Sequence, residues 1–318
     1  MALISVVLSF RNEAPLIPEL IARVTGALAQ TDCAHELIFV NDASTDQSLE
    51  ILTTHAAADP RIKVITMSRR FGPSECVLAG LRYAQGDAAI FMDTDLQDPP
   101  ELLPTLIKCW QDGSDVVHTV RTARAAESAV KMALTRVAYR LIRAISDLDL
   151  RVEAGDFKLL SRRAVQAVLT LPETDPYLRG LAVWVGFRQE YIPYERAPRA
   201  AGVTHFPFFS PNPWRTVLSG LTSFSVTPLL IWGPLGAAVM LAGLGALVWS
   251  LMVDATSWQW VLTAVLILSG MQLLGLGVIG LYLARVYRDG RRRPAYVVAE
   301  TIGWPDRSPQ SPPSPDRS

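Results

Sequence analysis

Short apolar runs alternate with stretches of helical period along residues 1–120. The runs read as buried strands, and the stretches between them repeat apolar positions every three or four residues, as amphipathic helices do. The predicted strands are Ile4–Ser9, Glu36–Val40, Ile62–Met67, Ala88–Met92 and Asp115–Val120. The predicted helices lie near 15–30, 46–58, 73–85 and 100–111. This alternation predicts an α/β domain with a mainly parallel sheet and right-handed crossovers.

The last third of the chain has a different pattern, with two long stretches that lack any charged side chain. They run from Thr216 to Val253 and from Ala255 to Ala284. Each exceeds the roughly 20 residues that a helix needs to cross a bilayer. Both are apolar all round and flanked by tryptophan, so buried helices of a soluble core explain them poorly. We expect two transmembrane helices, at 228–253 and 258–284.

Basic residues predict the orientation of these helices. Several arginines follow the second helix, from Arg285 to Arg293, whereas the connecting turn carries Asp254 and no base. Positive charge marks the cytoplasmic side. We therefore expect a two-span protein of the inner or plasma membrane with both termini in the cytoplasm. The run Leu3–Leu8 is too short for a signal peptide. The predicted divisions are a cytosolic domain (1–209), an interfacial amphipathic segment (210–227), two transmembrane helices (228–287) and a basic, disordered cytosolic tail (288–318).

Small residues recur in the first predicted span, where Ala238, Ala242 and Ala246 are spaced by four. Such a stripe permits close helix packing, and with it a homo-oligomer. Alanine is equally common in membrane helices that have no such role, so both explanations stand.

Composition narrows the classes of function. Apolar residues make up 50% of the chain, and the mean hydropathy is +0.23. The formal net charge is zero, so no overall field favours nucleic acid as a partner. Cys33, Cys76 and Cys109 are scattered without C-x-x-C spacing, which excludes a zinc site of that kind and fits a reducing compartment.

The densest group of acids follows the predicted strand Ala88–Met92. Asp93, Asp95 and Gln97 put hard oxygen atoms at the carboxyl end of a strand, where open α/β sheets bind ligands. Such oxygen atoms suit Mg²⁺ or Mn²⁺, and a metal of this kind typically holds substrate phosphates. Asp98 is expected instead to cap the helix that begins at the prolines after it.

The loops after the first two strands are also polar. The first strand runs into Ser9-Phe10-Arg11-Asn12-Glu13 and lacks the G-x-G-x-x-G pattern, so an NAD or FAD enzyme is not expected. The second runs into Asn41-Asp42-Ala43-Ser44-Thr45-Asp46. Thr45 or Asp46 is expected to cap the next helix, which leaves Asp42 to accept hydrogen bonds from a base or ribose.

Together these segments resemble family 2 glycosyltransferases of the GT-A (Rossmann-like) fold, and within them the subfamily that acts on polyprenyl phosphates. Gly155–Arg163 is similar to the G-D-F-R-L-L-S-R-R segment of that subfamily. The likeness extends to Arg179–Phe187, Tyr194–Arg199 and the two C-terminal spans, in the same linear order over about 1–290. The chain departs from the family pattern at Arg11, at Asn41, at Thr135 and at Thr204-His205-Phe206, positions that concern base stacking and acceptor binding rather than the reaction class.

The resemblance implies a glycosyltransferase that moves a sugar from a nucleotide-sugar, UDP-glucose being favoured, to a polyprenyl phosphate in the membrane, with Mg²⁺ or Mn²⁺ as cofactor. The implied metal ligands are Asp93, Asp95 and Gln97. The implied contacts to the nucleotide-sugar are Ser9, Phe10, Arg11, Glu13, Asp42, Asp93 and Thr94. The implied contacts to the acceptor phosphate are Arg121, Arg124, Lys131, Thr135 and Arg136. The implied catalytic residues are Asp95, Asp156 and Arg179.

The ionisation of the acceptor phosphate affects the role that we expect for Asp156. A phosphate monoester has a second pKa of roughly 6, so the nucleophile is mostly dianionic at pH 7 and needs no strong base. Asp156 is then expected to orient the acceptor or take a residual proton, and an ordinary turn aspartate is the plainer alternative. A single displacement would invert the anomeric centre, because no second carboxylate is as well placed for a double displacement.

Three other functions remain open at this stage. A polyprenyl-phosphate mannose synthase would differ only in using GDP-mannose. A processive polysaccharide synthase usually carries Q-x-x-R-W near its spans and more transmembrane helices, and neither is present. A nucleotide-sensing membrane scaffold without catalysis would show degenerate metal ligands, whereas Asp93, Asp95 and Gln97 are all in place.

Overall fold

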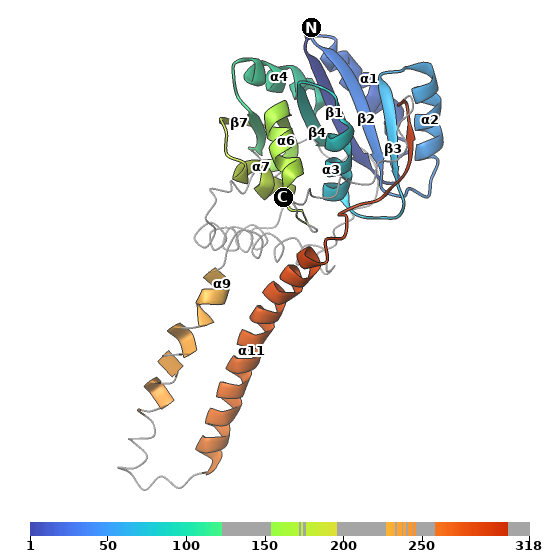
Figure 1. Ribbon diagram of the computed structural model, residues 1–318. Coiled ribbons are helices and arrows are strands. Elements are labelled where there is room, and N and C mark those ends of the chain that lie inside the picture. Colours follow the sequence, from blue (N-terminus) through green and yellow to red (C-terminus); the bar gives the residue numbers. More distant parts are fainter. Residues whose placement is uncertain are drawn as a thin grey trace, which may run out of the picture.

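The computed structural model describes residues 1–122, 154–195 without 172, 174 and 175, 227–245 without 233, 237, 240 and 244, and 258–304. Within these ranges an α/β domain carries a long projecting helix, α11 (Trp258–Gly290) (Figure 1). The domain is built on an eight-stranded sheet of order β7-β5-β6-β4-β1-β2-β3-β8. The strands are β1 (Leu3–Phe10), β2 (Ala34–Asn41), β3 (Ile62–Met67), β4 (Ala88–Asp93), β5 (Val116–Arg121), β6 (Ala154–Ser161), β7 (Gln189–Tyr194) and β8 (Val298–Ile302). The helices of the domain are α1 (Ile17–Leu28), α2 (Ser48–Ala58), α3 (Pro73–Tyr83), the 3-10 turn η1 (Pro100–Leu102), α4 (Leu103–Gln111), α6 (Arg162–Thr170) and α7 (Leu178–Trp184).

The centre of the sheet is parallel, as the sequence predicts. β1 pairs in parallel with β2 and β4, and β2 pairs in parallel with β3. These strands are rich in apolar residues and buried on both faces, as is typical of a parallel sheet between two layers of helices. All the predicted strands are confirmed, and none of their ends moves by more than two residues.

The hydrophobic pattern does not predict the outer strands. β6 runs antiparallel between β4 and β5, β7 lies parallel to β5, and β8 pairs antiparallel with β3. β6 carries Asp156 and Lys158, and β8 carries Glu300, so neither reads as an apolar run. β8 also falls inside the segment assigned above to the basic tail. The sheet is therefore mixed, with its parallel part at the centre.

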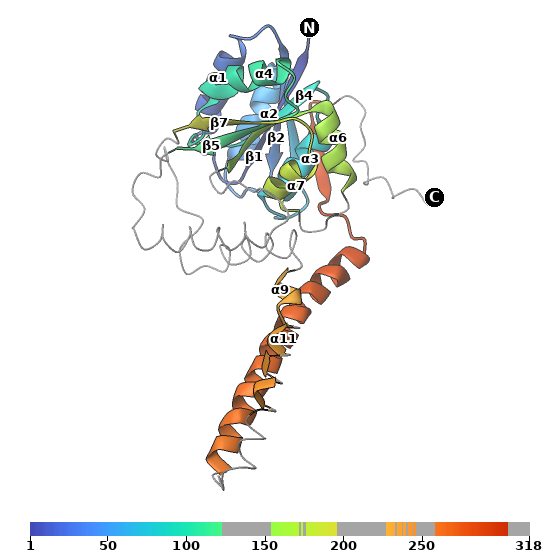
Figure 2. The ribbon, with the colours of Figure 1, turned by 90° about the vertical axis from the view of Figure 1, so that its left-hand side faces the viewer.

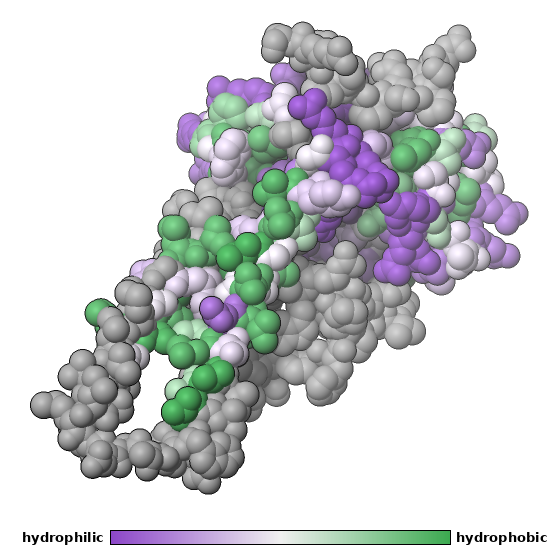
Figure 3. Space-filling view, turned by 60° about the horizontal axis from the view of Figure 1, so that its bottom comes forward, coloured by the Kyte–Doolittle hydropathy of each residue, from purple (hydrophilic) through white to green (hydrophobic). Residues whose placement is uncertain are grey.

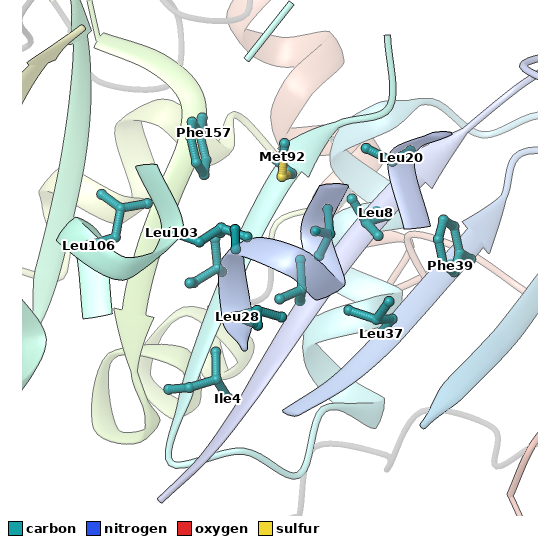
Figure 4. Packing of buried hydrophobic residues seen from close by; sticks show 14 of the residues in the cluster. Ile4, Leu8, Leu20, Leu28, Leu37, Phe39, Met92, Leu103, Leu106 and Phe157 are labelled. Carbon is teal, nitrogen blue, oxygen red and sulfur yellow. The ribbon is translucent and has the colours of Figure 1, made fainter. Parts of the chain in front are cut away.

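Two layers of helices cover the sheet (Figure 2). On one face α1 and α4 bring residues such as Leu20 and Leu103 against Leu8 and Phe39 of the sheet (Figure 4). The other face is covered by α3, α6 and α7. A Cβ atom at Gly80 of α3 would lie 2.2 Å from the side chain of Val7 on β1, so this helix can approach the sheet only with glycine there.

The carboxyl ends of the central parallel strands face α11 (Figure 1). β8 follows α11 after a short connection, and its first residue, Val298, pairs with Met67 at the end of β3. Beyond β8, the ring of Trp304 packs edge-on against Tyr83 of α3, with ring centroids 5.2 Å apart. The chain that leaves the projecting helix is therefore attached to the sheet through β3, beginning at the carboxyl end of that strand.

α11 has the length and composition to cross a membrane over Leu268–Gly290, where the mean hydropathy is 1.3. Its apolar side chains are exposed along its length, in contrast to the polar surface of the domain (Figure 3). Of the first predicted span the structure describes helical turns within 227–245, among them α9 (Thr227–Leu230), and no second helix of membrane-crossing length is found among the described residues. The ring of Trp232 in this segment lies against Gly275 of α11. Apart from Thr227, the predicted interfacial segment 210–227 lies outside the described residues.

Candidate active site

Three loops meet at the carboxyl edge of the sheet, one after each of β1, β2 and β4. Each contains a residue other than glycine with a positive φ: Asn12 at 57°, Ala43 at 53° and Leu96 at 56°. Such left-handed residues are uncommon, and their strain tends to be stored at functional sites. Their coincidence at one sheet edge agrees with the site that the sequence predicts there.

Hydrogen bonds join the loops after β1 and β2. The N–H of Asn12 donates to Ser44 Oγ at 3.1 Å, and Asn12 Oδ1 accepts from the N–H of Thr45 at 2.8 Å. Asp46 Oδ1 accepts from the N–H of Ser48 at the start of α2, at 3.1 Å. Burial would raise the pKa of Asp46, but hydrogen bonds from Ser48 and neighbouring backbone lower it. Asp46 therefore holds the first residue of α2, but the N-cap position is Gln47 and has no side-chain cap, so the predicted cap by Thr45 or Asp46 is not formed.

The carboxylate of Asp42 holds the loop after β3. Asp42 is 6% exposed, and its Oδ1 accepts from the N–H groups of Phe71 at 2.7 Å and Gly72 at 3.3 Å. Its backbone carbonyl accepts from Arg11 Nη1 at 3.2 Å. Asp42 thus connects three loops of the site edge, and its predicted contact with the nucleotide stays a prediction.

The segment after β4 alternates between partly exposed and buried residues. Asp93, Asp95 and Gln97 are partly exposed, whereas Thr94 and Asp98 are buried. The predicted metal ligands therefore share the accessible positions of this loop. Asp95 Oδ1 also accepts from the N–H of Gln97 at 3.2 Å, which holds the two residues together.

Asp98 does not cap the following helix, contrary to our prediction. The start of η1 has no side-chain cap, and Asp98 is fully buried. Its Oδ1 accepts from the hydroxyl of Tyr194 on β7 at 2.5 Å. That hydroxyl also accepts from Arg121 Nε at 3.2 Å. Burial and the neighbouring Asp98 raise the pKa of Tyr194 to about 12, so the hydroxyl stays protonated and bridges the loop to Arg121.

Two predicted contacts to the nucleotide have side chains that face the protein instead. Phe10 is 3% exposed and packs edge-on against Phe39 in the core, with centroids 6.3 Å apart, so its side chain does not line the site. Thr94 is 4% exposed and its hydroxyl donates to the carbonyl of Ser9 at 3.2 Å. Glu13 is also buried, at 8% exposure. The resemblance implied these contacts from positions in the sequence, which do not tell which way a side chain turns.

Asp156 lies beside the acidic loop. β4 and β6 pair antiparallel up to Phe91 opposite Lys158, and Asp93 and Asp156 follow that last pair at the same end of the two strands. On the other side of β4, Asp93 pairs with Ser9 of β1. Side chains of paired residues share a face of the sheet. The structure therefore places the predicted metal ligand Asp93 and the predicted acceptor residue Asp156 at the same end of two adjacent strands.

Arg179, in the first turn of α7, forms a two-pronged ion pair with Asp156. Its Nε lies 2.6 Å from Oδ1, and its Nη2 donates to Oδ2. Burial would raise the pKa of Asp156, but the charge and hydrogen bonds of Arg179 lower it below its ordinary value. Arg121 lies next to this pair, since its guanidinium packs over the backbone of Gly155. A carboxylate beside two guanidinium groups is a poor proton acceptor, and it can orient those groups to bind an anion.

A buried polar chain behind Asp156 was not predicted. Lys158 is fully buried, and its Nζ lies 3.0 Å from Nδ1 of His118 on β5. His118 Nε2 lies 2.9 Å from Oε1 of Gln189, whose amide nitrogen donates to the carbonyls of Val183 and Gly186. Because Gln189 presents its oxygen, His118 carries its proton on Nε2 and accepts from Lys158 on Nδ1. Burial lowers the pKa of Lys158 to about 7.

The remaining predicted acceptor contacts, Arg124, Lys131, Thr135 and Arg136, lie outside the described residues. So does the segment Thr204-His205-Phe206. In the described part of the Gly155–Arg163 segment, Arg162 donates to the backbone carbonyls of Ala84 and Gly86, far from the acidic loop, and so serves the fold.

Comparison with known proteins places this arrangement in a family. Residues 5–169 match the family model described as glycosyl transferase family 2. An uncharacterized glycosyltransferase, YkcC, of Bacillus subtilis is 38% identical over 307 residues, covering 94% of both chains. The bactoprenol glucosyl transferase of Shigella phage SfV is 34% identical over 303 residues, covering 93% of this chain and 97% of its own. The crystal structure of glucosyl-3-phosphoglycerate synthase from Mycobacterium tuberculosis is similar over 69% of this chain and 80% of its own, with 22% identity and a TM-score of 0.45. Because the family model spans more than half of the chain and the relatives match nearly all of it, this chain belongs to glycosyltransferase family 2.

Proposed function

We propose that this glycosyltransferase transfers glucose from UDP-glucose to a polyprenyl phosphate at the cytoplasmic face of the membrane. The observation that carries the proposal is that Asp93 of β4 and Asp156 of β6 lie at the same end of two adjacent strands, the end of the sheet that faces α11. A donor held by the loops of β1, β2 and β4 would lie beside an acceptor held at β6 and α7. Relatives named bactoprenol glucosyl transferase, which match over nearly the whole chain, favour glucose and a polyprenyl phosphate.

The side chains of the loop after β4 are suitable ligands for a divalent cation such as Mg²⁺ or Mn²⁺. Asp93, Asp95 and Gln97 offer oxygen atoms at partly exposed positions of one loop. Among the residues that the structure describes, no group of three His, Cys, Asp or Glu could hold a metal by itself. A cation bound here would therefore take further oxygen ligands from the donor diphosphate and from water, which is the usual habit of Mg²⁺. When bound, it neutralises charge on the departing nucleotide diphosphate.

The side chains at β6 and α7 act on the acceptor. A phosphate oxygen of the lipid attacks C1 of the sugar, the bond from C1 to the diphosphate oxygen breaks, and UDP leaves with the bonding electron pair. One displacement of this kind inverts the configuration at C1. Arg179 and Arg121 supply positive charge where two anions must approach, and Asp156 fixes the direction in which Arg179 points.

The proposal also includes the arrangement of the chain in the membrane. α11 and the segment before it form two spans, with the short turn outside and the arginines after α11 in the cytoplasm. The catalytic domain then lies against the cytoplasmic leaflet, within reach of the headgroup of the acceptor.

The test uses the full-length chain in vesicles that contain undecaprenyl phosphate and either Mg²⁺ or Mn²⁺. Each of UDP-glucose, GDP-mannose and UDP-N-acetylglucosamine is supplied in turn, and the lipid is analysed by mass spectrometry. The expected product is a glucosyl phosphoryl lipid from UDP-glucose alone, and chelation of the metal stops its formation. Product from another donor would refute the choice of glucose, and no product from any donor would refute the proposed acceptor.

A further inference from the structure

An ion pair joins α11 to the loop that leads into α7. Arg285 Nη2 lies 3.2 Å from Oε2 of Glu173, a residue 112 positions away in the chain. The two side chains are 12% and 24% exposed, so the pair is largely withdrawn from water. Arg285 also lies 4.0 Å from Asp289, one turn further along α11. Screening by solvent is weaker for such a pair than for one on an open surface.

Glu173 belongs to the connection between α6 and α7. Arg179, in the first turn of α7, donates to both carboxylate oxygens of Asp156. The other end of α7 is held by Gln189, which donates to the carbonyls of Val183 and Gly186. α7 is thus a short helix with contacts at both ends, and the connection that carries Glu173 enters it at Leu178, beside Arg179.

Arg285 occupies the end of α11 where the apolar surface stops. The helix exposes apolar side chains up to Val286, and the residues after Gly290 are basic and then join β8. This end of the helix therefore lies at the depth of the lipid headgroups, where the phosphate of a polyprenyl acceptor also lies.

We propose that the contact between Arg285 and Glu173 positions the Asp156–Arg179 pair relative to the bilayer, and so relative to a phosphate carried by a lipid. This inference rests on the proposed function. The loops after β1, β2 and β4, which would bind the nucleotide-sugar, are held by hydrogen bonds that involve neither Arg285 nor Glu173. A displacement of about 1 Å is enough to weaken catalysis between two positioned reactants.

Charge reversal tests the contact. All variants are made in an Asp289→Asn background, because a glutamate at position 285 would otherwise lie beside Asp289. In that background Arg285→Glu and Glu173→Arg each bring like charges together, and the double variant restores an opposite pair. Transfer is measured with undecaprenyl phosphate in vesicles and with a short-chain prenyl phosphate dissolved in water. Each single variant should lose about tenfold or more in rate with the vesicle acceptor, with less than a twofold change for the soluble acceptor and for the KM of the donor. The double variant should recover most of the loss.

Arg293→Glu is the matched control, because it makes the same charge change at an exposed residue of the basic segment after α11. Equal losses with both acceptors, or a failure of the double variant to recover, would show that the pair only supports the fold. An equal loss in Arg293→Glu would show that the total charge matters rather than the contact. Either result overturns the inference.

A second measurement does not depend on sugar transfer. A dye is attached at Thr53→Cys, an exposed position of α2, in a chain with Cys109→Ser, and energy transfer to headgroup-labelled lipid reports the height of the domain above the bilayer. The single reversals should change the transfer efficiency and the double variant should restore it. An unchanged efficiency overturns the inference even if the enzyme is active. A restored change in a chain that makes no glycolipid would support the contact and refute the proposed function instead.

Discussion

Arg179 donates hydrogen bonds to both carboxylate oxygens of Asp156, with Nε 2.6 Å from Oδ1. The pair joins α7 to β6 at the end of the sheet where the neighbouring strand β4 ends in Asp93. Because Arg179 lowers the pKa of Asp156, this aspartate is a weak proton acceptor near neutral pH. Its geometry suits a residue that aims a guanidinium group at an anion.

Replacing Arg179 with alanine should chiefly affect use of the acceptor. The substitution removes a charge-assisted contact and leaves the carboxylate of Asp156 without its partner, beside the place where an anion must bind. We expect the KM for polyprenyl phosphate to rise roughly 10- to 100-fold, as for the loss of one such contact. The KM for the donor should change little. Steady-state kinetics with each substrate varied separately decides this, and a larger effect on the donor would contradict the assignment.

The dependence of rate on pH should follow the acceptor rather than Asp156. The second pKa of a phosphate monoester is roughly 6, so the reactive dianion is lost as the pH falls through that value. The rate with saturating donor should therefore decline below about pH 6. Asp156→Asn should lower the rate but leave the midpoint of this decline where it was. If the decline disappears in Asp156→Asn, the aspartate is the titrating base and this account of it is wrong.

Asp95→Asn should abolish turnover while the chain stays folded. Asp95 is partly exposed, and its Oδ1 accepts a hydrogen bond from the backbone N–H of Gln97, which an asparagine oxygen can also do. An amide binds Mg²⁺ more weakly than a carboxylate does, so binding of the metal and donor should fail first. Calorimetric titration of Mn²⁺ with UDP measures this directly. Asp32→Asn, at an exposed loop position, serves as the control and should behave like the wild type.

The parallel strands of the sheet could be predicted from the sequence because each corresponds to a local run of apolar residues. The parallel strands are continuous apolar runs, so Ile62–Met67 is found at its observed ends. β6 is different, because Lys158 interrupts its apolar pattern. The amine of this buried lysine forms a hydrogen bond with His118, a partner 40 residues away in the chain. The same holds for Asp98, whose environment is set by Tyr194 from another strand. Contacts between distant segments decide these side chains, and no local pattern encodes them.

Gly275 should be required for the packing of the segment around Trp232 against α11. A Cβ atom at Gly275 would lie 3.2 Å from the indole ring of Trp232, tighter than ordinary contact, and a larger side chain would force the two segments apart. Gly275→Leu should lower stability in detergent by about 1–3 kcal/mol, the usual cost of overpacking. Gly277→Leu is the control, since no atom of the described residues lies within 4 Å of its Cβ position. Thermal unfolding of both variants tests the contact, and recovery in Gly275→Leu with Trp232→Ala would assign the loss to the indole.

Lys158 should make the stability of the domain depend on pH. Its pKa is about 7 in the folded chain against 10.5 for the ordinary side chain, because burial disfavours the ammonium form. Between these two values the unfolded chain binds more protons than the folded chain. Stability should therefore rise with pH from about 7 to 10, by at most about 1.4 kcal/mol per pH unit for one proton. Below pH 7 both states bind the proton and the contribution of Lys158 becomes constant.

Lys158→Met keeps most of the side-chain volume and removes the titrating amine, so the rise in stability over this range should disappear. Lys108→Met, at an exposed position of α4, should retain it. Denaturant unfolding at several pH values gives the slope for each chain. Tyr194 opposes the trend only above about pH 10, because its pKa is raised in the folded state and stability is lost there as the pH increases. A wild-type slope that Lys158→Met leaves intact would mean that the buried amine is already paired well enough to keep its proton, and the chain through His118 would then be an ionic contact rather than a neutral one.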